Sequence, residues 1–241
     1  MTRWPRDHPE TLDVGCARAK PSQPAARKTK LGGVSTLRWL DRKLTRPVRV
    51  FFQNRADHRR LAALEPPVRL VIGASTRRLP GWHHTDQRYL DLVKPADWHR
   101  LFRPGTLAGL FAEHVWEHLT PDAALVAART CHTFLAPGAC LRVAVPDGLH
   151  PDPAYIDGAR PGGTGGGAAD HQVFYDYRSL SQVFEAVGFR TELLEYYDET
   201  GTFHRKDWTD ERGHVTRSAR YDSRNQGGRL VYTSVILDAV K

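Results

Sequence analysis

Three side chains that can ligate metals or transfer protons lie close together near the middle of the sequence. His114, Glu117 and His118 are spaced i, i+3 and i+4, so on a helix they would share one face. Such a group can bind a divalent metal ion, with the distant His171 as a fourth ligand. Alternatively, Glu117 and His118 start a helix, bond to nearby backbone groups and shape a pocket. We assign no metal ligand from the sequence, and a divalent metal stays an open alternative.

The second half of the chain offers candidates for general acid–base catalysis. His171 follows a Gly-rich segment at 160–167, where a loop can bring an imidazole to a bound substrate. Its alternative role is to cap the following helix or to order that loop. His118 and Asp147 are the other two candidate catalytic residues.

A third pattern could bind a ligand through the backbone. The apolar run at 68–72 predicts a strand that leads directly into Gly73, Ala74 and Ser75. Small residues in such a turn let a nucleotide-like ligand approach backbone amides closely. About eleven residues later, Asp86 follows a second predicted strand, where a carboxylate could accept hydrogen bonds from ribose hydroxyls. An ordinary strand-to-helix turn and a loop cap are the alternatives.

Strand-like and helix-like segments alternate along the chain, which is typical of an α/β fold with a mostly parallel sheet and helices on its faces. The predicted strands are 68–72, 82–86, 89–93, 106–112 and 140–145, and the predicted helices are 121–134 and 177–187. Two β-rich segments, 190–197 and 230–240, could pair as a long hairpin. The polar insertion between them, at about 198–228, would form either a flap over the site or a surface excursion.

Two segments carry a resemblance to a known family. The block Glu113–Leu119 and the segment 135–147 closely resemble the fourth and fifth strand motifs of class I S-adenosylmethionine-dependent methyltransferases. The resemblance extends from about residue 68 to residue 189, half of the chain. It implies a Rossmann-like fold with a seven-stranded sheet and a final antiparallel hairpin, S-adenosylmethionine as cofactor, and methyl transfer to an oxygen or nitrogen of an unidentified small-molecule or glycan-like acceptor.

The resemblance also implies a set of cofactor-binding residues. They are Gly73, Ala74 and Ser75 under the methionine moiety, Asp86 at the ribose, Asp91 and Leu92 beside the adenine, and Glu113 and His114 flanking the cofactor. The family's glycine-x-glycine turn has alanine and serine after Gly73 here, so its second glycine is missing. Catalysis in this class rests mainly on holding the two reactants in line and excluding water.

Two other functions fit parts of the pattern. A methyltransferase-fold protein that has lost its cofactor would be a non-catalytic binding protein for an acidic partner. The H-x-x-E-H string at 114–118 also matches the inverzincin peptidase signature, which would make the chain a zinc hydrolase. A peptidase carries this motif inside a helix, whereas here it follows a predicted buried strand.

Charge and composition divide the chain. Residues 1–47 hold 11 Lys or Arg against 4 Asp or Glu, so most of the net charge of +8 lies there. We expect a flexible basic arm at 1–33, a helical lead-in at 34–66 and a methyltransferase domain at 67–241. Because the body lacks a basic excess, nucleic acid is disfavoured as a partner relative to a small molecule. The oligomeric state is not predicted.

Composition also bears on the compartment. No apolar run reaches the roughly 18–20 residues that span a bilayer, and the polar N-terminus lacks the apolar stretch of a secretory signal. Cys16, Cys131 and Cys140 have no paired spacing, so neither disulfides nor a thiolate zinc site is indicated. We therefore expect a cytoplasmic protein.

Overall fold

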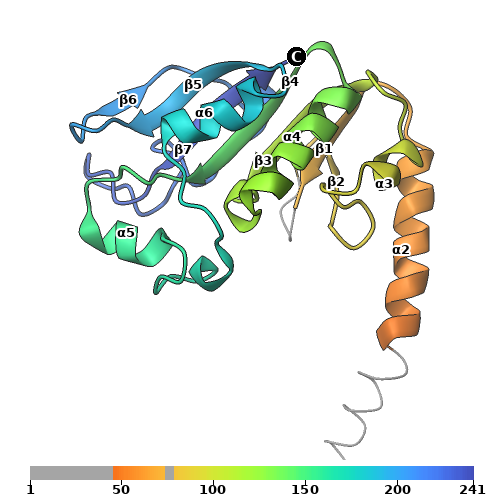
Figure 1. The fold of residues 1–241 in the computed structure, drawn as a ribbon, viewed down its shortest axis with the longest axis horizontal. Helices are drawn as coiled ribbons and strands as arrows, with labels where there is room; N and C mark the ends of the chain where they lie inside the picture. Colours follow the sequence, from red (N-terminus) through yellow and green to blue (C-terminus); the bar gives the residue numbers. More distant parts are fainter. Residues whose placement is uncertain (1–45, 74–78) are drawn as a thin grey trace, which may run out of the picture. The chain divides into compact units, whose positions relative to one another are not determined.

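The computed structural model describes residues 46–73 and 79–241, and residues 47–241 form a compact unit (Figure 1). The helices are α2 (Arg46–Ala62), α3 (Pro95–His99), α4 (Pro121–Phe134), α5 (Pro153–Ala159) and α6 (Tyr177–Glu185), with 3-10 turns η2 (Trp116–His118), η3 (Ala168–Asp170) and η4 (Asp210–Arg212). The strands are β1 (Val68–Ile72), β2 (His83–His84), β3 (Leu107–Glu113), β4 (Leu135–Pro146), β5 (Arg190–Tyr197), β6 (Phe203–Arg205) and β7 (Ser234–Val240). The predicted basic arm and the first part of the lead-in lie outside the described residues.

The strands form a seven-stranded sheet in the order β2-β1-β3-β4-β7-β5-β6. Strands β2, β1, β3 and β4 pair in parallel, whereas β7 lies antiparallel between β4 and β5, and β6 pairs antiparallel with β5. The predicted Rossmann-like α/β fold and the hairpin of the two C-terminal β-rich segments are confirmed. Parallel pairing is confined to the first half of the sheet.

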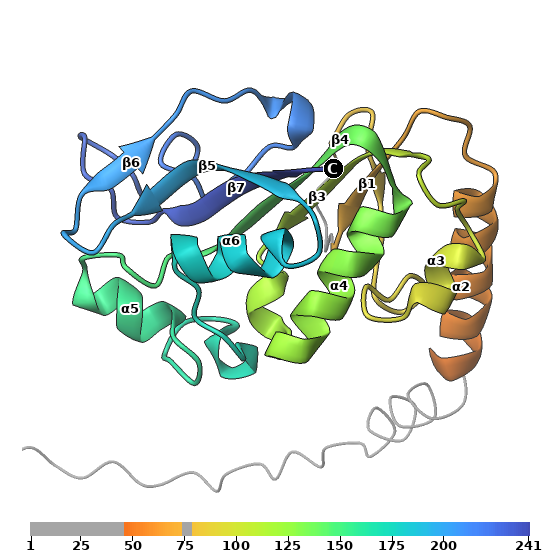
Figure 2. The ribbon, with the colours of Figure 1, turned by 45° about the horizontal axis from the view of Figure 1, so that its top comes forward.

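One face of the sheet packs against helices. Leu70 of β1, Leu110 of β3 and Val143 of β4 are fully or almost fully buried and belong to one apolar core. Figure 2 shows α4 and α6 lying along this side of the sheet, and Phe134 and Phe184 of these helices join the same core. The other face of the sheet is covered as well, by the insertion described below. Because both faces are buried, the central strands are nearly continuous apolar runs.

The opposite face is covered by the polar insertion. Because side chains alternate across a strand, Val71 and Phe111 point to this side, where Trp208 and Val215 pack on them. Gly213 (φ +125°) lies so close that a Cβ there would be 2.5 Å from the Phe111 ring. The insertion is therefore packed on the sheet and is not a loose surface excursion. Within 46–73 and 79–241, this face carries coil and a short 3-10 turn where helices were expected.

A buried ion pair fixes the insertion to the sheet. Arg142 of β4 stands opposite Asp238 of β7, and the guanidinium donates to both carboxylate oxygens at 2.7 and 3.0 Å. The same guanidinium donates to the carbonyl oxygens of Thr209 and Gly213 at 2.6 and 3.0 Å. Both charged side chains are at most 3% exposed. At this position the sheet contacts the insertion through the buried Arg142–Asp238 ion pair and not through apolar side chains.

Several elements differ from the sequence prediction: the strand predicted at 82–86 is shortened to β2, β4 begins at Leu135 and not at residue 140, and β6 was not predicted. Residues 89–93 form turns and not a strand, because the amides of Tyr89 and Leu90 donate to the Asp86 carbonyl and the Val93 amide donates to the Asp91 side chain. These local bonds leave few amides for a partner strand. Helix α5 was not predicted, and it begins where the Asp152 carboxylate accepts from the Ala154 amide. No described helix is long and apolar enough to cross a membrane.

Candidate functional site

A cavity of about 360 Å³ opens at the carboxyl ends of β1 and β3, and we call it the strand-end cavity. Ligands of open parallel sheets gather at this edge. Its lining residues come from the end of β1, the turns before α3 and the segment around η2: Ile72, Gly73, Gln87, Leu90, Asp91, Leu92, Val93, His114, Val115, His118 and Leu119. Four predicted cofactor-binding residues, Gly73, Asp91, Leu92 and His114, are therefore brought together.

Gly73 is the residue at which the strand turns into the cavity. Its φ of +66° is readily adopted only by glycine, and a Cβ there would lie 2.8 Å from Cγ2 of Val115. A side chain at this position would be both strained and in contact with a wall of the cavity. Ala74 and Ser75 lie outside the described residues.

The two predicted aspartates differ in their placement. Asp91 is 6% exposed and lines the cavity, with its carboxylate bound by the Lys94 ammonium at 2.8 Å and the Val93 amide at 3.1 Å. Asp86 is not among the lining residues. Its carboxylate accepts from the Arg88 side chain and backbone at 2.9 Å, and this hydrogen bonding lowers the pKa of the Asp86 carboxyl. The ribose-binding role of Asp86 stays a prediction.

His114 connects the strand-end cavity to a second cavity of about 400 Å³, because it lines both. Its φ is +56°, a left-handed conformation that costs a non-glycine residue free energy and is often found at functional sites. The neighbouring Glu113 lines neither cavity, since its Oε1 accepts from the Arg217 amide at 2.8 Å. It anchors the insertion beside the end of β3.

The second cavity brings together segments that are far apart in the sequence. Helix α5, the Gly-rich loop, the insertion and the segment just before β7 all contribute, and the lining residues include Tyr155, His171, Arg217, Arg224 and Tyr232. Of these, only His171 was singled out from the sequence. The other four were missed because their approach depends on the insertion folding back over the sheet; the run of arginines at 212–224 was the available signal.

The predicted histidine–glutamate group is also assembled. One ligating atom each of Glu117, His118 and His171 lies within 4.8 Å of the others, and the rings of the two histidines are 4.8 Å apart. The amides of Gln172 and Val173 donate to the Glu117 carbonyl at 2.7 and 3.2 Å, which holds the His171 segment against η2. Sequence spacing alone could not show this approach.

Both histidines of this group have a defined tautomer. Nδ1 of His118 lies 3.3 Å from the Asp170 carbonyl oxygen, and Nδ1 of His171 lies 2.7 Å from that of Ala159. Because a carbonyl oxygen only accepts, Nδ1 carries the proton in each neutral ring and Nε2 keeps a free lone pair. The lone pairs are therefore available to a proton or a metal ion.

Glu117 is the buried member of the group, only 1% exposed. Its Oε1 is 3.0 Å from Nδ1 of His114, within ion-pair distance, yet neither carboxylate oxygen makes a hydrogen bond with a described residue. A buried carboxylate without hydrogen bonds is costly, and such groups at native sites usually have a further partner.

Asp147 is held in a structural position. It is fully buried, and its two carboxylate oxygens accept from the Leu149 and Tyr197 amides at 3.0 and 2.7 Å. Burial raises the pKa of this carboxyl to about 6. Asp147 lines neither cavity, so its geometry favours joining β4 to β5 over contact with a substrate. Its catalytic role stays a prediction.

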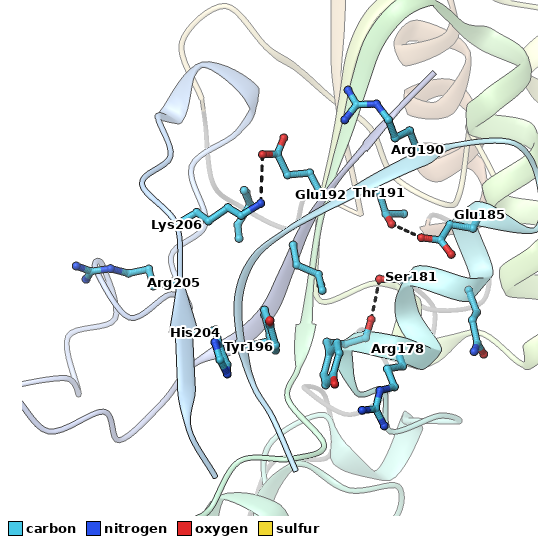
Figure 3. Close-up of a pocket in the computed structure, with 14 residues that line it drawn as sticks. Arg178, Ser181, Glu185, Arg190, Thr191, Glu192, Tyr196, His204, Arg205 and Lys206 are labelled. Carbon is cyan, nitrogen blue, oxygen red and sulfur yellow. Dashed lines mark hydrogen bonds and ion pairs between the residues drawn. The ribbon is translucent and has the colours of Figure 1, made fainter. Parts of the chain in front are cut away.

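A hollow of about 720 Å³ lies elsewhere, between α6 and strands β5 and β6 (Figure 3). Its polar groups pair with one another: Lys206 lies 3.6 Å from Glu192, and the Thr191 hydroxyl donates to Glu185. It shares no lining residue with the strand-end or second cavity. We therefore interpret it as a solvated groove and place the candidate site at the strand ends.

No family model matches the chain, and no curated protein matches its sequence. Solved structures do resemble it at low identity. An S-adenosylmethionine-dependent methyltransferase from Archaeoglobus fulgidus has 13% identity and a TM-score of 0.41, covering 80% of this chain and 94% of the other. A possible histamine N-methyltransferase from Thermotoga maritima has 11% identity and a TM-score of 0.41, with coverages of 84% and 98%.

A third structure is the 1,6-didemethyltoxoflavin-N1-methyltransferase of Burkholderia thailandensis, with 14% identity, a TM-score of 0.41 and coverages of 91% and 92%. All three are methyltransferases. The Burkholderia structure contains 1,6-didemethyltoxoflavin and S-adenosylhomocysteine. At these identities and TM-scores the likeness carries no inference about activity, which has to be argued from this chain's own cavities and motifs.

Proposed function

We propose that the chain is a class I S-adenosylmethionine-dependent methyltransferase that modifies an oxygen or nitrogen of a small molecule. The observation that carries the proposal is the pair of cavities that share His114. Transfer between two bound molecules needs two binding sites that meet at one point, and the cavities supply that arrangement. The strand-end cavity would take the cofactor and the second cavity the acceptor.

The residues of the strand-end cavity fit such a cofactor. Gly73 brings backbone to the cavity wall, where its missing Cβ lets Val115 pack closely, and Asp91 offers a carboxylate while Leu92 offers an apolar surface. These are the groups that a nucleoside with an amino-acid tail requires. When bound, S-adenosylmethionine supplies an activated methyl group on a sulfonium.

The chain's own residues then have three tasks. His114 separates the cavities and positions the two ligands, and the surrounding walls exclude water. His171 lines the acceptor side with a free Nε2, so it can accept a proton from the acceptor atom as the methyl group is transferred. The Ala159 carbonyl fixes the tautomer that this step needs.

The alternatives are less well supported by the geometry. The H-x-x-E-H string does not lie inside a helix: η2 spans three residues, and His114 precedes it with a left-handed backbone. A peptidase helix motif therefore does not form. A non-catalytic binding protein keeps the fold but would lack cofactor affinity, so cofactor binding separates it from the enzyme.

The first test is calorimetric titration with S-adenosylmethionine and S-adenosylhomocysteine. We expect both to bind the wild-type chain and Gly73→Ala to weaken binding at least tenfold, because the added methyl meets Val115. Gly138→Ala is the matched control: Gly138 has a similar φ of +77° with no atom near its Cβ position, so it carries the backbone strain alone. An Asp86→Ala variant tests the ribose prediction in the same assay.

Failure of the wild-type chain to bind either compound would contradict the proposal and favour the binding-protein alternative. Equal weakening by Gly73→Ala and Gly138→Ala would show that strain, and not the cavity wall, is responsible. In the first case the strand-end cavity would not be the cofactor site, and in the second case the contact with Val115 would not explain the loss of binding.

We propose in addition that Glu117, His118 and His171 hold a divalent metal ion. Two neutral imidazoles and one carboxylate are a common ligand set for zinc and related metals. The free Nε2 positions and the buried Glu117 carboxylate, which makes no hydrogen bond with a described residue, support this. The hydrogen bonds from Nδ1 to backbone carbonyls are the supporting contacts that orient metal-ligating histidines elsewhere. A bound cation would occupy Nε2 of His171 and acidify an acceptor hydroxyl, so in the metal-bound protein the cation would replace His171 in activating the acceptor.

Metal binding can be measured without any turnover. Metal-stripped protein titrated with Zn²⁺ or Mn²⁺ should show one saturable class of site, weakened at least tenfold in Glu117→Gln and His171→Gln. His214→Gln, which alters a histidine paired with Asp210 in the insertion, should bind like the wild type. Unchanged affinity in both ligand variants would rule out the metal site and leave Glu117 and His118 as local structural residues.

A further inference from the structure

The second cavity has an uneven charge. Two guanidinium groups, those of Arg217 and Arg224, line it, whereas Asp152 is its only carboxylate. The Asp152 carboxylate is already engaged, because it caps α5 through the Ala154 amide at 2.9 Å and lies 3.8 Å from Arg229. The lining therefore carries two guanidinium groups against one engaged carboxylate, and Asp222, which is outside the lining, pairs with one of them, Arg224.

Arg224 is held rigidly with part of its guanidinium unused. Its Nε and Nη2 donate to the two oxygens of Asp222, which is 7% exposed, and its guanidinium lies 3.7 Å from the centre of the Tyr232 ring. This pairing and stacking fix the planar group in one orientation. Nη1 has no hydrogen-bond acceptor among residues 46–73 and 79–241. A preorganised donor with a free edge is suited to a planar or tetrahedral anion.

Arg217 differs in that its backbone is fixed while its side chain is free. Its amide donates to Glu113 and its carbonyl accepts from the Ser234 hydroxyl at 2.7 Å, so the residue is tied to the ends of β3 and β7. The side chain forms no ion pair or hydrogen bond within the described part of the chain. It lines the cavity without an ion pair or hydrogen bond of its own, so it can close on a ligand.

Two tyrosine rings form a further part of the cavity wall. The rings of Tyr155 and Tyr232 are 4.8 Å apart, and the Tyr155 hydroxyl is turned inward, donating to the Thr233 carbonyl and accepting from the Asp147 amide. Tyr155 thus offers the cavity its ring and not its hydroxyl. An apolar surface beside paired arginines is the usual composition of a site for a small organic anion.

We propose that the acceptor carries an anionic group, a carboxylate or a phosphate, that is bound by Arg217 and Arg224. The anion would lie at the arginine side of the cavity, and the methyl-accepting atom would face His114 and His171. This inference rests on the proposed function, because it names the acceptor class of the same site. Arg217 and Arg224 are specificity-determining residues in this assignment and take no part in the transfer itself.

Simple probes test the assignment. Protein saturated with S-adenosylhomocysteine is titrated with benzoate, phenyl phosphate and the neutral benzamide, in low salt. We expect the two anions to bind at least tenfold more tightly than benzamide, and Arg217→Gln and Arg224→Gln each to remove most of that preference. The relative affinity of benzoate and phenyl phosphate identifies which anion the site takes. Arg129→Gln, an exposed arginine of α4, is the control and should change nothing.

The outcomes separate this inference from the function on which it rests. If S-adenosylhomocysteine binds the wild type and both arginine variants equally, yet neither benzoate nor phenyl phosphate binds more tightly than benzamide, the anionic acceptor is wrong and the methyltransferase proposal stands. If S-adenosylhomocysteine does not bind the wild type, the function itself fails. Loss of cofactor binding in the arginine variants would also overturn the assignment, because it would place them in the cofactor site.

Discussion

His150 is a titratable side chain in a position that excludes its charged form. It is 3% exposed and stacks on the Tyr155 ring with centroids 3.9 Å apart. Its Nδ1 accepts from the Asp152 amide at 3.1 Å, so the ring must stay unprotonated at that nitrogen, while Nε2 has no partner. Burial lowers its pKa to about 4. Because His150 packs against a wall of the second cavity, its protonation affects the site as well as the fold.

We predict that His150 makes the chain less stable in mild acid. The folded pKa is below the unfolded value of about 6.5, so stability present above pH 6.5 is lost as the pH falls toward 4. The size should be roughly 1–2 kcal/mol after allowance for solvent screening. Chemical denaturation at several pH values gives the free energy of unfolding of the wild type and of His150→Phe. The change with pH in the difference between these two free energies measures the contribution of His150.

The comparison with a variant is necessary because Asp147 acts in the opposite direction. Its pKa is raised to about 6 by burial, so its contribution to stability is present at low pH and is lost as the pH rises through about 6. In the wild type, the pH-dependent contributions of His150 and Asp147 to the free energy of unfolding partly cancel. A difference between wild type and His150→Phe that does not vary between pH 7 and 4 would contradict the His150 prediction.

At the scale of elements, β4 and β7 are joined by more than their backbone ladder. The Arg142–Asp238 pair lies inside the packed face, and Arg212 adds a second ion pair to the same carboxylate at 3.0 Å. The Trp208 ring lies 4.8 Å from the Arg142 guanidinium. One arginine thus links two strands and the insertion.

Replacing Arg142 alone should reduce the free energy of unfolding more than replacing Arg142 and Asp238 together with apolar residues. Arg142→Met leaves the Asp238 carboxylate buried with one partner fewer and frees two carbonyls, so we expect a loss of about 3–5 kcal/mol in the free energy of unfolding. The double variant Arg142→Met, Asp238→Leu should lose less than the sum of the two single changes. Urea denaturation measures each value, and Arg129→Met on the exposed face of α4 is the control. Strict additivity would refute the coupling.

Elements with strong local signals could be predicted closely from the sequence. The apolar run of β1, the helix α4 between Thr120 and Phe134, and the strand β5 have the predicted bounds. Helix α4 begins where Thr120 accepts from the Ala123 amide and Pro121 takes the first helical position. The segment 89–93 failed because its side chains and amides bond locally, a competition that apolar periodicity does not reveal.

At the scale of the whole molecule, the site divides into a part visible in the sequence and a part that is not. Gly73 and His114 follow strands directly, and Glu117 comes soon after β3, so strand order places them at one edge of the sheet. The arginines and tyrosines of the second cavity come from segments whose position depends on long-range packing. Residue types alone could not assign them to one cavity.

The insertion performs two tasks with one stretch of chain. Trp208 and Val215 seal one face of the sheet, and a few residues later Arg217 and Arg224 reach the second cavity. Substitutions or length changes that alter the recognised molecule therefore also disturb the sheet that supports it. Descendants of this chain can diversify their substrates readily through α5 and the Gly-rich loop. Changes in the insertion can alter the substrate only if other substitutions restore the stability that the sheet loses.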